Sequence, residues 1–330
     1  MKEGTVSGMT LQIDRISKRF GEFQAIEDVS FTVEQGRMFG FLGTNGAGKT
    51  TTMRMVLDIL RPDSGTITWN GMSNRDIPRS QFGYLPEERG LYPKMPVQEQ
   101  LLYLAQLYGA EKQTAREALD HWLRQLNIEE NRNRKVEELS KGNQQKIQFL
   151  AAVLHDPEIL ILDEPFSGLD PVNVAQMEDA FNEMKARGKT IIFSTHQLSQ
   201  AQRLCEDVAI IHRGRMLIAG DVQAVRESIG VKILRLGVAG DDRLEWLSRY
   251  PEVEIRQRHR DHVEMQIPDE GVAQRILRDT LDRGMQIELF EVTVPSLNDV
   301  FLTKVRDSGA SAEDIERITA STDRGEAVVA

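Results

Sequence analysis

Hydrophobic and polar positions alternate through much of residues 9–75, which is typical of strands that bury one face. The alternation is clear in Leu11–Ile13 and again in Phe31–Val33. A continuous apolar run at 38–42 interrupts this pattern, and a helical spacing follows from 50 to 60. We therefore predict strands in residues 9–75 and, embedded among them, one short apolar strand that leads through a glycine-rich loop into a helix.

Apolar residues change to helical spacing between about 96 and 157, which predicts a helical subdomain. Helical patterns then alternate with apolar runs at 158–162, 190–194 and 208–211. Such alternation is typical of a mostly parallel sheet covered by helices. The sequence thus predicts an α/β domain over residues 9–229.

A boundary falls near Gly230, and a second unit is predicted over 230–306. Its pattern gives strand, helix, strand, strand, helix and strand, which is the order of a ferredoxin-like α+β domain. A last helix begins at Ser296, with Asp299 placed three residues on as in a capping box. Residues 307–330 are small and polar, so we predict a flexible tail there.

Net charge, the length of apolar runs and the cysteine count limit the kinds of partner and environment that this chain suits. The chain has 330 residues and a formal net charge of -10, which disfavours a nucleic-acid partner because such proteins usually carry a basic surface. Nowhere does the sequence approach the roughly 20 consecutive apolar residues that span a bilayer. Cys205 is the single cysteine, so no intrachain disulfide forms and a reducing cytosol fits. We expect any membrane role to require a partner protein.

Residues 43–50 read GTNGAGKT and match G-x-x-x-x-G-K-[ST], with an apolar strand before and a helix after. Glycines let the backbone turn so that N–H groups and the helix N-terminus face a phosphate. We expect Lys49 to reach the β- and γ-phosphates of ATP and the Thr50 hydroxyl to hold Mg²⁺. The predicted phosphate-binding set is Gly43, Thr44, Asn45, Gly46, Ala47, Gly48, Lys49, Thr50 and Thr51.

Asp163 and Glu164 directly follow an apolar strand at 159–162. In an open parallel sheet this placement brings both acids to the edge that carries the phosphate loop. We expect Asp163 to bind Mg²⁺, directly or through water, and Glu164 to orient or deprotonate the attacking water. These parts indicate a nucleotide hydrolase, and the sequence contains no N-K-x-D run of the kind that reads guanine.

The segment LSKGNQQ at 139–145 resembles the signature of the ABC ATPases, LSGGQ, with Lys141 and Asn143 in place of two signature residues. The resemblance implies a P-loop ABC ATPase core with an antiparallel β subdomain and a helical subdomain. It also implies that Ser140 and Gly142 contact the γ-phosphate of ATP held by a second subunit, in a homodimer or pseudo-dimer. Read alone, Ser140 is an ordinary helix cap.

Further positions match the same family in order along the chain. Phe20 corresponds to the aromatic residue that stacks on adenine, and His196 to the switch histidine that contacts the γ-phosphate. Residues 167–170 resemble the loop that communicates across the dimer. Glu87 stands where the family has a glutamine, and its carboxylate would still ligate Mg²⁺ or its water. Without the resemblance, Phe20 reads as core and His196 as structural.

Segments 83–95, 139–146 and 291–302 are similar to a bacterial exporter branch that includes sodium-efflux ATPase subunits. The resemblance implies a cytoplasmic, membrane-peripheral ATPase that energises a separate integral membrane permease. Branch substrates range from Na⁺ to drugs and peptides. We expect the permease contact at 87–95.

Two other classes remain as alternatives. A soluble ABC ATPase acting on ribosomes or DNA is disfavoured, because the chain has one cassette, no long heptad region and no basic excess. A regulatory binding module with weak hydrolysis would suit Glu87. The presence of both Glu164 and His196 argues against it.

Overall fold

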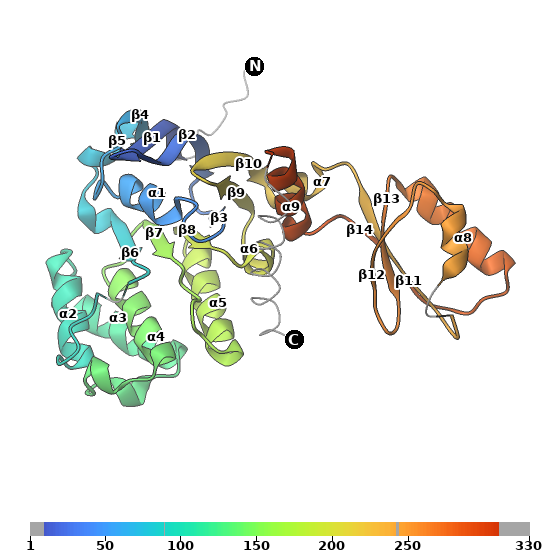
Figure 1. Ribbon diagram of the computed structural model, residues 1–330. Helices are drawn as coiled ribbons and strands as arrows, with labels where there is room; N and C mark the ends of the chain where they lie inside the picture. The colour runs from blue at the N-terminus through green and yellow to red at the C-terminus, as the bar shows by residue number, and fades with distance from the viewer. Residues whose placement is uncertain (1–9, 89, 242–243, 310–330) are drawn as a thin grey trace, which may run out of the picture. The chain divides into compact units, whose positions relative to one another are not determined.

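The computed structural model describes residues 10–88, 90–241 and 244–309 and forms two compact units (Figure 1). The first unit ends at Asp221, and the second covers Val222–Gly309. Most of the predicted tail, from residue 310 on, lies outside the described residues. Within the described part of the chain, no helix has the length and apolarity needed to cross a membrane.

An antiparallel sheet forms the N-terminal part of the first unit. The alternation predicted for it is confirmed, since Leu11 and Ile13 are buried whereas Gln12 is exposed. In order across the sheet, the strands are β2 (Phe23–Glu34), β1 (Thr10–Phe20), β4 (Ser64–Trp69) and β5 (Met72–Ser73).

A six-stranded sheet forms the centre of the first unit, and all of its strands run parallel except β10. Its inner strands β3, β7 and β8 are buried on both faces, which explains their continuous apolar sequences. In order across the sheet, the strands are β10 (Arg215–Asp221), β9 (Asp207–His212), β3 (Met38–Leu42), β8 (Thr190–Thr195), β7 (Ile159–Asp163) and β6 (Phe82–Leu85).

The two sheets share one hydrophobic core. Phe31 of β2 stacks on Phe39 and Phe41 of β3, with ring centroids 5.2 Å apart in both pairs. Helices α1 (Lys49–Val56), α5 (Pro171–Ala186) and α6 (Leu198–Leu204) complete this part of the unit.

Helix α1 ends earlier than predicted. The sequence predicts a helix from 50 to 60, but the chain leaves the helix after Val56. Asp58 adopts a left-handed backbone with φ of 51°, and the N–H groups of Ile59 and Leu60 both donate to the carbonyl oxygen of Arg54. These bonds satisfy the end of the helix without extending it.

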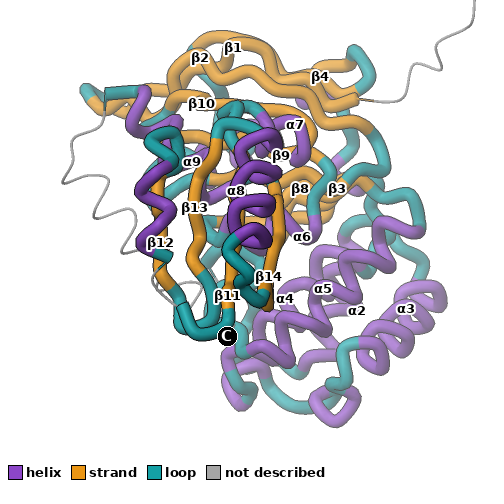
Figure 2. The backbone as a smooth tube through the Cα atoms, turned by 90° about the vertical axis from the view of Figure 1, so that its right-hand side faces the viewer, coloured by secondary structure: helices purple, strands orange, loops and turns teal. Residues whose placement is uncertain are grey.

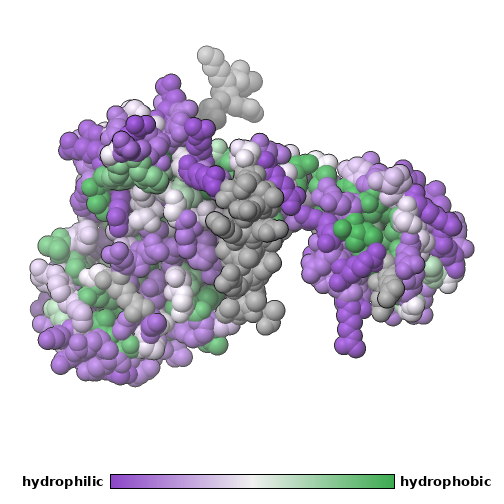
Figure 3. Space-filling model, in the orientation of Figure 1, coloured by the Kyte–Doolittle hydropathy of each residue, from purple (hydrophilic) through white to green (hydrophobic). Residues whose placement is uncertain are grey.

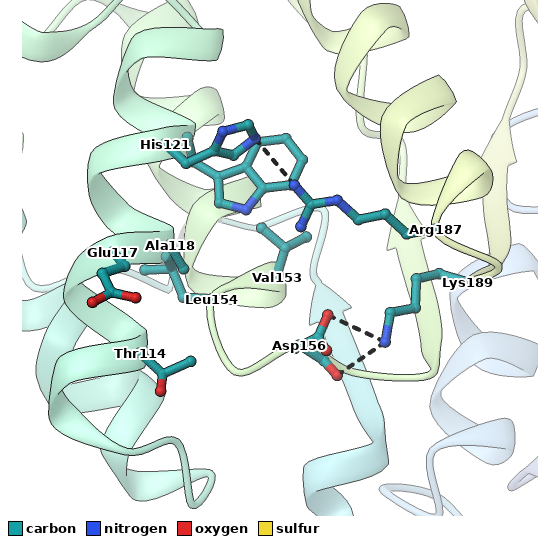
Figure 4. Close-up of a pocket in the computed structure, with 10 residues that line it drawn as sticks. Thr114, Glu117, Ala118, His121, Val153, Leu154, Asp156, Arg187 and Lys189 are labelled. Atoms are coloured by element: carbon teal, nitrogen blue, oxygen red, sulfur yellow. Dashed lines mark hydrogen bonds and ion pairs between the residues drawn. The ribbon is translucent and has the colours of Figure 1, made fainter.

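The helical subdomain contains α2 (Val97–Leu107), α3 (Lys112–Gln125) and α4 (Lys141–Val153). Trp122 of α3 is buried and packs edge-on against Phe149 of α4, with centroids 5.8 Å apart. A cavity of about 550 Å³ lies beside this contact, between α3 and the turn that joins α5 to β8 (Figure 4). Its cations are already paired, Arg187 with Glu183 and Lys189 with Asp156.

The second unit has the predicted ferredoxin-like order, with the sheet arranged β12-β13-β11-β14 and every pair antiparallel. Helix α8 covers one face of this sheet (Figure 2). The helix predicted around residues 244–250 is only the short 3₁₀ helix η5. The elements are α7 (Val222–Glu227), β11 (Lys232–Val238), η5 (Glu245–Arg249), β12 (Glu254–Arg258), β13 (Val263–Ile267), α8 (Glu270–Asp282), β14 (Ile287–Thr293) and α9 (Leu297–Asp307).

The ends of the second unit are joined to each other. Arg226 of α7 donates to the carbonyl oxygens of Val294 and Pro295, just before α9, at 3.2 and 2.8 Å. At the start of α9, Ser296 and Asp299 form the predicted capping box. The sheet, η5 and α8 of this unit pack around a core of their own, whereas α7 and α9 lie outside that core and contact each other.

Candidate functional site

The carboxyl ends of four adjacent parallel strands carry most of the predicted site residues. The loop 43–48 follows β3, His196 follows β8, Asp163 and Glu164 close β7, and Glu87 follows β6. Because β8 lies between β3 and β7, His196 leaves the sheet between the loop and the two acids. Ligands of open parallel sheets bind at this edge.

The loop after β3 requires glycine for steric reasons. Gly48 has φ of 108°, and a Cβ there would lie 2.4 Å from Cδ1 of Ile26 and 2.9 Å from the carbonyl oxygen of Ala25. No side chain caps α1 at Gly48. The first N–H groups of α1 are therefore available to an anion, and the helix dipole favours one there.

Lys49 extends back along the loop. Its Nζ donates to the carbonyl oxygens of Gly43 at 2.8 Å and Thr44 at 3.3 Å, and it lies 3.2 Å from Glu164 Oε1. The other carboxylate oxygen of Glu164 lies 3.0 Å from His196 Nδ1. The Glu164 carboxylate thus joins the loop lysine to the histidine that follows β8.

The backbone of Glu164 is strained. Its φ is 48°, a left-handed conformation that non-glycine residues seldom adopt. The Glu164 N–H donates to the carbonyl oxygen of Ser194 at 3.2 Å and to the Ser194 hydroxyl at 3.1 Å. These bonds to β8 hold the acid in its turn.

Asp163 has the features of a metal ligand. Its side chain is fully buried, Oδ1 accepts from the Ser194 hydroxyl, and Oδ2 has no hydrogen-bond partner among the described residues. Burial and, after it, the Asp163 charge raise the pKa of the neighbouring Tyr84 hydroxyl. A buried carboxylate with one unsatisfied oxygen is costly unless a cation approaches it, so the site fits Mg²⁺ or a water bound to it.

A cavity of about 380 Å³ opens over the loop. It brings together the loop, the start of α1, Glu164 and Glu87, although these segments lie far apart in the sequence. Its lining residues are Phe23, Ala25, Asn45, Gly46, Gly48, Lys49, Thr50, Thr51, Glu87 and Glu164.

The aromatic residue that lines this cavity is Phe23, not Phe20. The two residues are paired across the turn between β1 and β2, and both side chains are largely exposed, 64% for Phe23 and 48% for Phe20. Instead of lining the cavity, Phe20 lies beside the Lys18 ammonium, 5.8 Å from its ring centroid. The motif position marks the turn but not which of its two aromatics lines the cavity, and the stacking of Phe20 on adenine stays a prediction.

Ser140 and Gly142 lie outside the cavity lining as well. Ser140 caps α4 by accepting from the N–H of Asn143 at 3.3 Å, and its side chain is exposed. A Cβ on Gly142 would lie 2.8 Å from Nδ2 of Asn173 in α5, so this turn packs closely against the core. The capped end of α4 therefore faces outward rather than into the chain's own cavity.

Two sequence families match the chain. Residues 26–167 match the family described as ABC transporter. Residues 220–305 match the C-terminal domain of DrrA1-3-like ATP-binding proteins.

Individual relatives extend this likeness over most of the chain. The ABC transporter ATP-binding protein YhaQ of Bacillus subtilis (strain 168) is 45% identical over 295 residues, which cover 89% of this chain and 98% of YhaQ. The Nod factor export ATP-binding protein I of Burkholderia lata is 37% identical over 67% of this chain and 74% of its own length. A solved ATP-binding subunit of an ABC transporter superposes with a TM-score of 0.63 at 35% identity, over 67% of this chain and 93% of that chain.

The two aromatics of the β1–β2 turn give a matched pair of variants. Phe23→Ala is expected to weaken ATP binding about tenfold, because stacking of a base on an aromatic ring contributes about 1–3 kcal/mol. Phe20→Ala removes a comparably exposed ring from the same turn and is expected to change binding less than twofold. Titration of both variants with a fluorescent ATP analogue decides between them. A larger loss of affinity in Phe20→Ala than in Phe23→Ala would assign adenine stacking to Phe20.

Proposed function

Because the chain belongs to the ATP-binding proteins of ABC transporters, we propose that the cluster at the ends of β3, β6, β7 and β8 is its ATP hydrolysis site. Members of this family hydrolyse ATP to drive transport through a membrane permease. The observation that carries the proposal is the Glu164 carboxylate. It borders the cavity within 3.2 Å of Lys49 Nζ and 3.0 Å of His196 Nδ1.

Phosphate binding is assigned to residues 43–51. Lys49 is held by Glu164 and by two carbonyl oxygens of its own loop. An arriving triphosphate offers Lys49 stronger partners, and the loop N–H groups and the N-terminus of α1 bind the remaining oxygens. Transfer of Lys49 to the phosphates releases Glu164 from its ion pair.

The same site would hold Mg²⁺ between the Thr50 hydroxyl, Asp163 and the phosphate oxygens, where the ion neutralises phosphate charge. Among the described residues, no cluster of three or more His, Cys, Asp or Glu side chains could hold a metal ion alone. Mg²⁺ typically uses one or two protein ligands together with substrate phosphates. Glu87 lines the same cavity and is the third oxygen donor available to the ion or its water.

Glu164 is assigned as the group that orients and deprotonates the attacking water. Once Lys49 has moved to the phosphates, one Glu164 oxygen faces the cavity while the other remains near His196. His196 is assigned the contact with the γ-phosphate. In-line attack then needs only a water held between Glu164 and that phosphate.

A second copy of the chain, or a related subunit, is proposed to complete the site. Ser140 caps an exposed helix end whose N–H groups are suited to a phosphate, yet it does not line the cavity of its own chain. Binding of ATP between the loop of one subunit and Ser140 of the other would make closure depend on the nucleotide. The segment 167–170, exposed except for Leu169, lies near this surface, since Asp170 caps α5 and Asn173 packs on Gly142.

Contact with a permease is assigned to the segment 87–95 and the adjoining face of α2. Tyr103 and Leu107 are 54% and 67% exposed and lie one turn apart on α2, and Tyr92 is also exposed. Figure 3 shows hydrophobic colour over this helix, within a mainly hydrophilic surface. Gln100 ties the segment to α2, because its side-chain amide accepts from Tyr92 N–H at 3.3 Å and donates to Met95 O at 3.2 Å.

The direction of transport is proposed to be export, in line with the name of the Nod factor export relative. The chain would then act as a peripheral subunit on the cytoplasmic face of the cell membrane, and the permease would select the substrate.

The catalytic assignment is tested by Glu164→Gln. Turnover of ATP is expected to fall at least 100-fold, since general-base catalysis contributes about 10²–10⁴-fold. Affinity for ATP is expected to stay equal or rise, because Lys49 no longer has to leave a charged partner. Glu158→Gln alters a carboxylate at the opposite end of β7 and serves as the control. Unchanged turnover in Glu164→Gln would remove Glu164 from this role.

The docking assignment is tested by Leu107→Glu, with Leu281→Glu as the control. Both leucines are exposed on helices, 67% and 59% respectively, so each change costs the isolated subunit little stability. Co-purification with the permease partner is expected to fail for Leu107→Glu and to persist for Leu281→Glu. Equal recovery of both variants would contradict a permease contact on α2.

A further inference from the structure

Ser194 lies inside the central sheet between the two halves of the site. It belongs to β8, where it pairs with Phe41 of β3 on one side and Asp163 of β7 on the other. Residues paired directly in neighbouring strands project their side chains to the same face of the sheet. Ser194 and Asp163 are both fully buried, so their side chains meet away from solvent.

One hydroxyl contacts both consecutive acids. Ser194 Oγ donates to Oδ1 of Asp163 and accepts from the backbone N–H of Glu164 at 3.1 Å. The hydroxyl therefore donates its proton to the carboxylate of Asp163 and accepts, through a lone pair, the backbone N–H of Glu164. In the hydrogen bonds described for this site, no group of the phosphate loop or of His196 contacts both Asp163 and Glu164.

The donated bond makes the two oxygens of Asp163 unequal. Oδ1 is bound to Ser194, whereas Oδ2 is buried and has no hydrogen-bond partner among the residues that the structure describes. A carboxylate fixed in this way presents a single oxygen in a single direction. Without the Ser194 proton, the side chain of Asp163 would be free to rotate and both oxygens would lack a donor.

The accepted bond acts on Glu164. The left-handed φ of 48° at Glu164 is unfavourable for a residue with a Cβ, and it persists only where surrounding contacts impose it. The Ser194 hydroxyl adds to the bond from Glu164 N–H to the Ser194 carbonyl oxygen at 3.2 Å. Orientation of the Glu164 carboxylate follows from that turn.

We propose that Ser194 is a positioning residue of the ATPase, which aims Asp163 Oδ2 at Mg²⁺ and holds Glu164 in the turn that faces the attacking water. The inference rests on the proposed function of the same cluster. Ser194 touches neither nucleotide nor metal and acts through the two acids. Groups that orient a metal ligand in this manner typically change metal affinity or activity by about 10–100-fold when they are removed.

The experiment measures metal and nucleotide binding separately, on the full chain and without turnover. Mn²⁺ is titrated into protein saturated with ADP and followed by electron paramagnetic resonance, and Mg²⁺ affinity is obtained by competition. ADP binding is measured in parallel in EDTA. For Ser194→Ala we expect metal affinity to fall about tenfold. Affinity for ADP in EDTA is expected to stay within about twofold, because Lys49 and the loop are unaltered.

Conservative variants separate positioning from folding. Ser194→Thr keeps the hydroxyl and is expected to restore metal affinity. Ser194→Cys keeps a similar size but donates weakly, so it should resemble Ser194→Ala even if the alanine variant folds poorly. Thr190→Val is the matched control, since Thr190 is a fully buried hydroxyl residue of the same strand whose Oγ1 accepts only from Gly36 N–H at 2.9 Å in the described contacts.

Two failures are distinguishable. If the unaltered chain binds ADP no better with metal than in EDTA, the proposed function of the cluster fails. If the unaltered chain shows metal-dependent binding but Ser194→Ala and Ser194→Cys keep it undiminished, the role of Ser194 fails. An equal loss of metal affinity in Thr190→Val would also overturn it, because the effect would then follow from any hydroxyl lost from β8.

Discussion

The parallel pairing of β3, β8 and β7 is the constraint on which the site depends. Each strand delivers one part at its carboxyl end, and β8 lies between the phosphate loop and the acids. Ser194 of β8 and His196, which follows this strand, therefore both reach the acids at the end of β7, His196 the Glu164 carboxylate and Ser194 the Asp163 carboxylate. A shift of one residue in this register would turn Ser194 to the opposite face and separate the acids from their partners.

Helix α4 connects the site to the surface assigned to the permease. Ser140 caps its N-terminus, and Gln145, just over one turn on, donates to the carbonyl oxygen of Pro165, next to Glu164. Farther along the helix, Gln148 donates to the carbonyl oxygens of Pro86 and Glu88, which flank Glu87.

These bonds give a physical route for coupling. A second subunit that drew Ser140 toward its own nucleotide would displace a helix whose Gln148 side chain holds the backbone on both sides of Glu87. The same segment is tied through Gln100 to the exposed face of α2. Nucleotide binding at Ser140 and permease docking on α2 would thus both shift the equilibrium position of α4 and of the segment around Glu87.

Much of the fold and site follows from local sequence. The turn of the loop 43–48 was predictable because Gly43 and Gly48 act through backbone geometry within a few residues. The acids after 159–162 were predictable because a buried strand must end at the ligand edge of the sheet. That Phe23 rather than Phe20 lines the cavity depends on how a turn packs over the loop, and the bonds of Ser194 to the two acids depend on a register between strands 30 residues apart in sequence. Neither relation leaves a periodic or motif signal.

The most direct test of a shared site is the mass of the Glu164→Gln protein in solution, measured by sedimentation equilibrium with and without ATP and Mg²⁺. The account predicts a single 37.4 kDa chain without nucleotide and twice that mass when ATP is bound, with the larger species lost when Ser140 is replaced by Glu. A protein that is saturated with ATP and still sediments as one chain would contradict it.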